Sequence, residues 1–433
     1  MSLFLLILDG NSISNGELLG RLLNLTNVKK ADLTSNHLGP NGAKQLAEFL
    51  SQNKSLEELV LATNRLEVDG FLAIMNAIKG NKNFKSFNFA SNHLDALIRG
   101  PLVDALKTNV DLVALDLSDN PLGDDCASEI LAGLVGNKSL QYLNLTQCGL
   151  NPASGEAIAK FLEVHPHVSR LKIGYNKFSA QNGVTLGHSI QSNNLVVLDL
   201  RFTNIGASGT CGVFSGLLNN HSIVELIVNG NAINKKGLGI LTTVLSGNNT
   251  LQKLGMRYCE IGKSGFITLA KIISTNSSIT YLDVSHNSLD STEACKQLAA
   301  ALGHAKTRKG DKISATVINE LNISNCLIGP KQLDELAEGL VRNRSIKTLH
   351  LDDNELGIKG MRALSVAVKQ NQVLKIITVQ DTHISTSDVV VFMEKAADEC
   401  FIEVLDCRKN GIDAGNSQFV QAQKRYNKYK ILL

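Results

Sequence analysis

A repeated pattern of leucine and asparagine constrains this chain more than any other feature. The pattern LxLxxNxL recurs along the 433 residues, for example at Leu59–Leu66, Leu115–Leu122 and Leu349–Leu356, and at Leu282–Leu289 with valine in place of the second leucine. Alignment on its asparagine, which we call the ladder position, gives fifteen repeats. The ladder residues are Asn11, Asn36, Asn64, Asn92, Asn120, Cys148, Asn176, Thr203, Asn231, Cys259, Asn287, Cys326, Asn354, Thr382 and Asn410. Twelve of the fourteen steps between them are 27 or 28 residues, which is typical of a repeat protein.

Each repeat predicts a short strand, a turn and a helix. In the third repeat, Leu59 and Leu61 have the two-residue period of a strand. The apolar residues between positions 72 and 78 have the spacing of a helix. The ladder residue lies in the turn between them, so consecutive repeats would stack strand on strand and helix on helix.

Three kinds of residue are expected to shape the turns. A ladder residue such as Asn64 would donate hydrogen bonds to buried backbone groups, and Cys or Thr would replace it in some repeats. Glycines such as Gly39 and Gly42 would allow tight bends at the start of each helix. Asparagines such as Asn53 and Asn343 would close each helix in the left-handed conformation.

This pattern resembles the leucine-rich repeat family, and the turn Gly39–Gly42 resembles that of the ribonuclease-inhibitor-like subclass. The resemblance implies an α/β leucine-rich repeat solenoid (horseshoe) of about 15 repeats of ~28 residues, with a parallel β-sheet on the concave face and helices on the convex face. We predict a single leucine-rich repeat domain over residues 1–433. Within it we expect a basic loop insertion at about residues 303–316, in the 39-residue step, and a C-terminal cap or tail at about residues 414–433.

Composition excludes several classes of protein. Lys and Arg total 43 and Asp and Glu total 40, so the chain lacks the strong positive charge of a dedicated nucleic-acid binder. The apolar run Leu3–Leu8 is far shorter than the roughly 20 residues of a membrane span. Cys259 and Cys326 lie two repeats apart, about 10 Å, which is too far for a disulfide. These observations predict a cytoplasmic protein that binds neither nucleic acid nor membrane.

Motifs for catalysis are absent from the sequence. It contains no phosphate-binding loop of the Walker type and no GxSxG, HExxH or CxxC motif. Its ten histidines are scattered over different repeats. We therefore predict no catalytic residues, no cofactor and no metal site.

The candidate binding surface is the set of strand positions that point away from the core. In the central repeats these positions hold five of the twenty aromatic residues, together with several cations. Aromatic and arginine side chains are typical anchors of protein interfaces. The predicted partner-binding residues are Tyr142, Lys172, Tyr175, Asp199, Arg201, Phe202, Arg257, Tyr258, Tyr281 and Asp283. The alternative is that outward strand positions merely tolerate any residue.

Three functions are compatible with these observations. The first is a non-catalytic protein–protein interaction module or scaffold that binds a protein partner on its concave face. The second is a regulator of a small GTPase, because the repeats are similar to those of Ran GTPase-activating proteins and Arg65 follows the ladder residue of an early repeat. The third is a scaffold subunit of a cytoskeletal or ciliary assembly. Because the chain opens directly into a predicted strand, we also expect a contact there with another chain or domain.

Overall fold

A computed structural model describes residues 4–303, 316–396 and 400–433 of the chain. These residues form sixteen strands of three residues each, fifteen α-helices and one short 3-10 helix. The chain divides into two compact units, unit 1 (Met1–Ile223) and unit 2 (Val224–Leu433), and each unit is described by itself.

Unit 1 alternates strands and helices in chain order. Its elements are β1 (Leu5–Ile7), α1 (Gly16–Thr26), β2 (Lys30–Asp32), α2 (Gly39–Leu50), β3 (Glu58–Val60), α3 (Glu67–Ile78), β4 (Ser86–Asn88), η1 (Ala96–Ile98), α4 (Arg99–Thr108), β5 (Ala114–Asp116), α5 (Gly123–Gly133), β6 (Tyr142–Asn144), α6 (Pro152–Val164), β7 (Arg170–Lys172), α7 (Ala180–Ile190), β8 (Val197–Asp199) and α8 (Gly206–Gly216). Each strand pairs in parallel with the next one, from β1 to β8.

Unit 2 follows the same plan. Its elements are β9 (Glu225–Ile227), α9 (Lys235–Leu245), β10 (Lys253–Gly255), α10 (Lys263–Thr275), β11 (Tyr281–Asp283), α11 (Thr292–Gly303), β12 (Glu320–Asn322), α12 (Pro330–Arg342), β13 (Thr348–His350), α13 (Gly357–Gln370), β14 (Ile376–Thr378), α14 (Thr386–Ala396), β15 (Val404–Asp406), α15 (Ser417–Arg425) and β16 (Lys430–Leu432). Its strands are also parallel neighbours in chain order.

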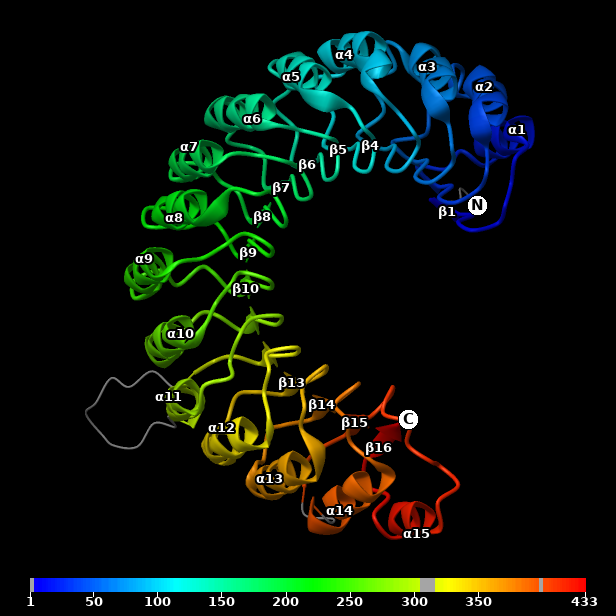
Figure 1. The fold of residues 1–433 in the computed structure, drawn as a ribbon. Helices are drawn as coiled ribbons and strands as arrows, with labels where there is room; N and C mark the ends of the chain where they lie inside the picture. The colour runs from blue at the N-terminus through cyan, green and yellow to red at the C-terminus, as the bar shows by residue number, and fades with distance from the viewer. Residues whose placement is uncertain (1–3, 304–315, 397–399) are drawn as a thin grey trace. The chain divides into compact units, whose positions relative to one another are not determined.

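The core of each unit lies between its strands and its helices. The central residue of each strand from β2 to β15, such as Leu59 in β3 or Leu349 in β13, is fully or almost fully buried. Apolar residues of the helices, such as Phe71 and Ile74 in α3, are buried as well. Figure 1 shows the helices of each unit on one side of its strands. The predicted α/β solenoid arrangement is therefore confirmed within each unit.

The ladder residues satisfy the backbone of the turns as expected. The side-chain amide of Asn64 donates to the carbonyl oxygens of Leu33, Leu61 and Ala62 at 2.8, 3.1 and 3.1 Å. Its side-chain oxygen accepts from the backbone N–H groups of Asn36 and Leu38 at 3.2 and 3.3 Å. One side chain thus joins its own turn to the preceding repeat.

Substituted ladder positions keep part of this pattern. The thiol of Cys148 donates to the carbonyl oxygen of Leu117 at 3.3 Å, and the hydroxyl of Thr382 donates to that of Val379 at 2.8 Å. Asn11 differs, because its side chain is exposed and donates to Asp9 O at 3.0 Å.

The prediction for the helix ends is wrong in its mechanism at Asn53, Asn137 and Asn343, although α1 does end at a left-handed asparagine, Asn27, with φ 50°. Asn53, Asn137 and Asn343 are not among the residues with positive φ, and Asn343 has φ −65° and ψ 140°. Instead, the side-chain oxygen of Asn137 accepts from the N–H groups two and three residues later, both at 2.8 Å, and its amide donates to Leu112 O at 3.0 Å. A second row of asparagines therefore stabilises the helix ends. These asparagines act through hydrogen bonds of the side chain and not through a left-handed backbone conformation.

The two glycines of the helix-start motif have different roles. Gly39 and Gly357 have φ of +60° and +51°, so the predicted bend is confirmed at the first position. At the second position, a Cβ atom on Gly42 would lie 2.5 Å from Ser14 O of the preceding repeat. The second glycine therefore permits close packing between repeats and does not form a bend.

Three further expectations concern the insertion and the ends of the chain. The basic segment of the predicted insertion lies outside the described residues, which end at Gly303 in α11 and continue from residue 316. The segment of the predicted C-terminal cap or tail contains α15 and then β16, which pairs with β15. At the first strand Phe4, Leu5 and Ile7 are exposed, and a contact there with another chain stays a prediction, as does the single domain.

The ladder can be tested at Asn64. We expect Asn64→Ala to lower the free energy of unfolding by about 3 kcal/mol, because it leaves buried backbone groups unpaired. The measurement is urea denaturation followed by circular dichroism. Asn11→Ala is the matched control, since the exposed side chain at that ladder position should change stability by less than about 0.5 kcal/mol. Equal effects of the two substitutions would contradict the assigned role of the ladder.

The close approach of α7 and α8 can be tested at Gly187. A Cβ atom there would collide with backbone atoms of Gly212, so we expect Gly187→Ala to destabilise the protein by about 1–3 kcal/mol. Gly239, inside α9, has open space around the same atom, and Gly239→Ala should stabilise by roughly 0.5–1 kcal/mol. Thermal denaturation of the two variants would then shift in opposite directions, and shifts in the same direction would refute the packing argument.

Candidate protein-binding surface

Six of the predicted contact residues lie on the strand face of unit 1, the side of the sheet turned away from the helices. They stand on β6, β7 and β8 or in the turns that follow β7 and β8. We call them the unit 1 patch, and they are Tyr142, Lys172, Tyr175, Asp199, Arg201 and Phe202.

The tyrosine of β6 is fixed by a carboxylate on the neighbouring strand. Oδ2 of Asp116 accepts from Tyr142 OH at 3.0 Å and from Asn144 Nδ2 at 2.9 Å. Oδ1 of Asp116 accepts from the N–H and the hydroxyl of Ser118 at 3.0 and 2.6 Å. Burial and then the charge of Asp116 raise the pKa of Tyr142. Lys172 Nζ lies 5.8 Å from the ring centroid of Tyr142, within cation–π range.

Arg201 is held in place by Asp199 and by a glycine of the adjacent repeat. Asp199 Oδ1 accepts from the backbone N–H and Nε of Arg201 at 3.1 and 2.9 Å, and Nη2 lies 2.8 Å from Oδ2. A Cβ atom on Gly174 would lie 2.7 Å from the Arg201 side chain, so the glycine leaves the space that the arginine occupies. The result is a preorganised arginine whose partner carboxylate is buried.

Tyr175 and Phe202 form a stacked pair. They occupy the position before the ladder residue in adjacent repeats, with φ of 54° and 50°. Their ring centroids are 5.0 Å apart and the rings are inclined by 18°. The exposed fractions are 48% and 37%. The left-handed turn thus displays large apolar rings on the surface of unit 1.

The other four predicted contact residues belong to unit 2, and we call them the unit 2 cluster. They are Arg257, Tyr258, Tyr281 and Asp283, on β11 and in the turn after β10. Tyr258 stacks on His286 with the ring centroids 4.0 Å apart and an angle of 20°. Burial and then Asp283 raise the pKa of Tyr281 to about 12.

Arg257 occupies the same repeat position as Arg201 but has different surroundings. Its guanidinium lies 5.8 Å from the Tyr258 ring centroid, and its Nε is 3.9 Å from Asp283 Oδ2. That buried Nε has no hydrogen-bond partner among the described residues. Asp283 Oδ1 instead accepts from the N–H and hydroxyl of Ser285 at 3.1 and 2.7 Å. Arg257 is therefore held less tightly by its own unit than Arg201 is.

A polar row on β12–β14 has the residue types of a catalytic relay. His350 lies 3.2 Å from Glu320 Oε1 through Nε2 and 3.1 Å from Thr378 Oγ1 through Nδ1. The hydroxyl of Thr378 donates to Asp352 Oδ2 at 2.7 Å, and Thr378 is buried. These bonds connect side chains of β12, β13 and β14 and of the turn after β13. The row is a hydrogen-bonded link between strands.

An open hollow in unit 2 is acidic. It has a volume of about 380 Å³, and Asp353, Glu355, Asp381 and the exposed Leu327 line it. The two aspartates occupy the turn position that carries Tyr175 in unit 1. The same turn position therefore carries an aspartate in some repeats and an aromatic residue in others, since Asp119 occupies it in unit 1 and Tyr258 in unit 2.

Arg65, the residue of the GTPase-regulator hypothesis, is exposed in the turn between β3 and α3 with φ 52°. This placement does not distinguish a functional arginine from any other surface arginine, so a role in GTPase regulation stays a prediction.

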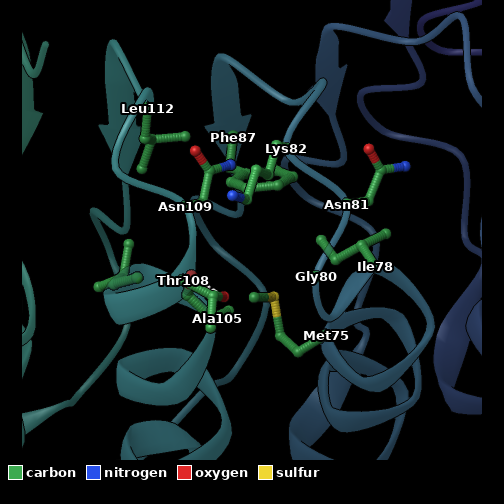
Figure 2. A pocket seen from close by; sticks show the side chains of 11 residues that line it. Met75, Ile78, Gly80, Asn81, Lys82, Phe87, Ala105, Thr108, Asn109 and Leu112 are labelled. Atoms are coloured by element: carbon green, nitrogen blue, oxygen red, sulfur yellow. Dashed lines mark hydrogen bonds between the residues drawn. The ribbon is translucent and has the colours of Figure 1, made fainter.

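A small cavity in unit 1 lies between α3 and α4. Met75 and Ile78 from α3, Ala105 and Thr108 from α4, and Phe87 from β4 surround it (Figure 2). Its volume of about 10 Å³ has room for no more than about one water molecule. It is therefore not a site for an organic ligand.

Over residues 4–303, 316–396 and 400–433, the structure brings together no group of three or more His, Cys, Asp or Glu residues that could hold a metal ion. In the same part of the chain, none of the helices has the length and apolar character needed to cross a membrane.

Some residues of the surface were not singled out from the sequence. Gly174 makes room for Arg201, and Gly255 makes room for Asn229, whose side-chain oxygen accepts from the backbone N–H of Arg257 at 2.9 Å. In each pair a glycine stands beside a larger residue of the neighbouring repeat. A comparison of side-chain sizes between adjacent repeats would have indicated both pairs.

Comparisons with known proteins agree with this architecture. The leucine-rich repeat family matches seven segments, residues 24–47, 108–131, 136–159, 191–209, 247–270, 275–292 and 342–365. Human NACHT, LRR and PYD domains-containing protein 13 is 27% identical over 237 residues, which cover 54% of this chain and 22% of that protein. Mouse ribonuclease inhibitor is 24% identical over 227 residues, which cover 52% of this chain and 48% of that protein.

A solved structure supports the fold. The crystal structure of the Rad7 and Elc1 complex in yeast contains a chain with a TM-score of 0.54 and 16% identity, covering 96% of this chain and 91% of that chain. At this identity the likeness concerns the fold alone.

The period, the ladder and the family matches define this chain as a leucine-rich repeat protein. The relatives place it in the ribonuclease-inhibitor-like kind. The matched segments span less than half the length of these two relatives. Leucine-rich repeat proteins are typically non-enzymatic protein-interaction modules, which supports a binding role for this chain.

The electrostatics of the unit 2 cluster can be tested at His286. Burial and then the positive charge of Arg257 hold the pKa of His286 below its ordinary value. Arg257→Gln removes one of these causes and should raise that pKa, as measured by NMR titration of the imidazole. Lys263→Gln, which removes a positive charge at the start of α10, should leave it unchanged. An unchanged pKa in Arg257→Gln would show that the arginine does not face the imidazole.

Proposed function

We propose that this chain is a non-catalytic protein-interaction module or scaffold that binds a protein partner through the strand face of its repeats. The observation that carries the proposal is the exposed stack of Tyr175 and Phe202 beside the braced Arg201. Large rings and a preorganised arginine are the side chains that dominate protein interfaces. They cost little conformational entropy on binding, because the stack and the ion pair already restrict them.

The members of the unit 1 patch contribute in different ways in this proposal. Tyr175, Phe202, Lys172 and Arg201 would contact the partner, since each is exposed or half-buried. Asp199 is buried and would act through Arg201, whose orientation it sets. The unit 2 cluster would be a second contact region, in which Arg257 has donor capacity that its own unit does not fill.

We also propose a cytoplasmic location. All eight cysteine side chains are buried. Burial raises the pKa of the Cys126 thiol to about 11 and that of the Cys259 thiol to about 12. Protonated, buried thiols suit a reducing compartment.

The proposal predicts that loss of the aromatic stack removes partner binding without loss of stability. The test variant carries Lys172→Gln, Tyr175→Asn and Phe202→Asn. Asparagine is chosen because it tolerates the positive φ of the two turn positions. Arg201 is left intact, because its removal would leave the buried Asp199 carboxylate without its cation. We expect partner affinity to fall roughly a hundredfold or more.

Affinity capture from cell extract with quantitative mass spectrometry compares this variant with the unchanged chain. Thr63→Asn is the control, since Thr63 is exposed at the same turn position with φ 54° in an earlier repeat. Proteins retained by the control and lost with the test variant are the expected partners. Capture of the same proteins by both variants, at similar melting temperatures, would refute binding through the unit 1 patch.

A further inference from the structure

We propose that the unit 1 patch recognises an acidic segment of a protein partner, in which carboxylates flank an aromatic side chain. This inference rests on the proposed function and adds the chemistry of the partner. The supporting observation is that the cations in and beside the patch are exposed or half-buried, whereas the carboxylates of Asp116 and Asp199 are buried.

The cations of β7 and of the turn after it lie at the surface, whereas Asp116 and Asp199 lie below it. The exposed Asp119, in the turn after β5, already accepts from Ser91 and Gln147 at 2.7 and 2.8 Å. Arg170 and Lys177, which stand beside the patch on β7 and in the turn after it, are exposed, and Lys172 between them is half-buried. The two carboxylates, Asp116 and Asp199, are only 8% and 4% exposed. An approaching partner therefore meets positive charge first.

The buried carboxylates of Asp116 and Asp199 also already accept hydrogen bonds from neighbouring groups. Asp116 accepts from Tyr142, from Asn144 and from both the N–H and the hydroxyl of Ser118. Asp199 accepts from the backbone and the side chain of Arg201. Carboxylates that have these partners are poor acceptors for a basic residue of a partner. The patch is thus complementary to carboxylates, whose charge the surface cations would pair.

The stacked rings define the second feature of the partner. Tyr175 and Phe202 present an exposed apolar surface in the same two repeats as Lys172, Lys177 and Arg201. The edge of an aromatic ring carries partial positive charge, so ring edges and cations favour the same anionic groups. An aromatic residue of the partner would extend the stack while its acidic neighbours reach the cations.

Single-stranded RNA is the competing class of ligand, because rings and cations also bind nucleic acid. In the unit 1 patch, however, one face of Tyr175 and one face of Phe202 pack on each other, and Lys172 lies over the ring of Tyr142. These contacts reduce the ring faces available to stack with successive bases. A protein segment is therefore favoured.

The test uses four probes with the full chain. Three are synthetic peptides with a central tryptophan flanked by glutamates, by glutamines or by lysines, and the fourth is a single-stranded oligouridine. Dissociation constants are measured by tryptophan fluorescence anisotropy for the peptides and with an end-labelled oligouridine for the RNA. We expect the glutamate peptide to bind at least about tenfold more tightly than the glutamine peptide, with affinity falling as salt rises.

The charge-reversal variant Arg170→Glu with Lys172→Glu should abolish this preference. The control variant Lys107→Glu with Lys138→Glu has the same net charge and changes exposed lysines of α4 and of the loop after α5. It should keep the preference, because these lysines do not belong to the patch. Melting temperatures confirm that both variants fold.

Several results would overturn the inference. They are equal binding of the glutamate and glutamine peptides, tighter binding of the lysine peptide or of oligouridine, no binding at all, and equal effects of the two charge-reversal variants. The capture experiment with the variant that carries Lys172→Gln, Tyr175→Asn and Phe202→Asn separates this outcome from failure of the proposed function. If capture still depends on the patch, only the acidic chemistry is wrong. If capture is independent of the patch, the proposed function itself fails.

Discussion

The hydrogen bonds that a ladder side chain makes to two neighbouring repeats are the interaction on which the rest of the structure depends. Each repeat of about 28 residues has a three-residue strand and one helix, so roughly half of its backbone lies in turns and loops outside these elements. Asn64 resolves this by donating to carbonyl groups of its own turn and of the preceding repeat. Because the same bonds recur, each turn conformation is set by its neighbours.

A second row of asparagines does the same at the other end of the repeat. Asn137 and its equivalents tie the end of one helix to the segment that enters the next strand. Each repeat is therefore fastened at both ends, and the strand face between them can vary without loss of the fold. This division explains how Tyr175 and Asp353 can occupy the same turn position in different repeats. It also leaves function to residues that the fold does not require.

The period and the leucines were sufficient to predict the class of fold, because the same apolar positions recur in every repeat. The helix ends were predicted with the wrong mechanism, since asparagine is compatible both with a left-handed cap and with a side-chain bridge, and the sequence does not distinguish them. The outward-facing positions were predictable from strand alternation alone. The different states of Arg201 and Arg257 were not, because they depend on the distance and orientation of the nearest carboxylate, Asp199 for Arg201 and Asp283 for Arg257.

The spacing of the stacked rings has a consequence for the geometry of any bound segment. Parallel strands repeat about every 4.8 Å, and Tyr175 and Phe202 follow that spacing with centroids 5.0 Å apart. A β-strand laid across the repeats would bring a side chain to the same face about every 6.7 Å, so its residues would soon fall out of phase. A polyproline II segment advances about 9.3 Å per turn, close to two repeats. Such a segment would present every third residue to every second repeat. The protein would then contact its partner at regular three-residue intervals.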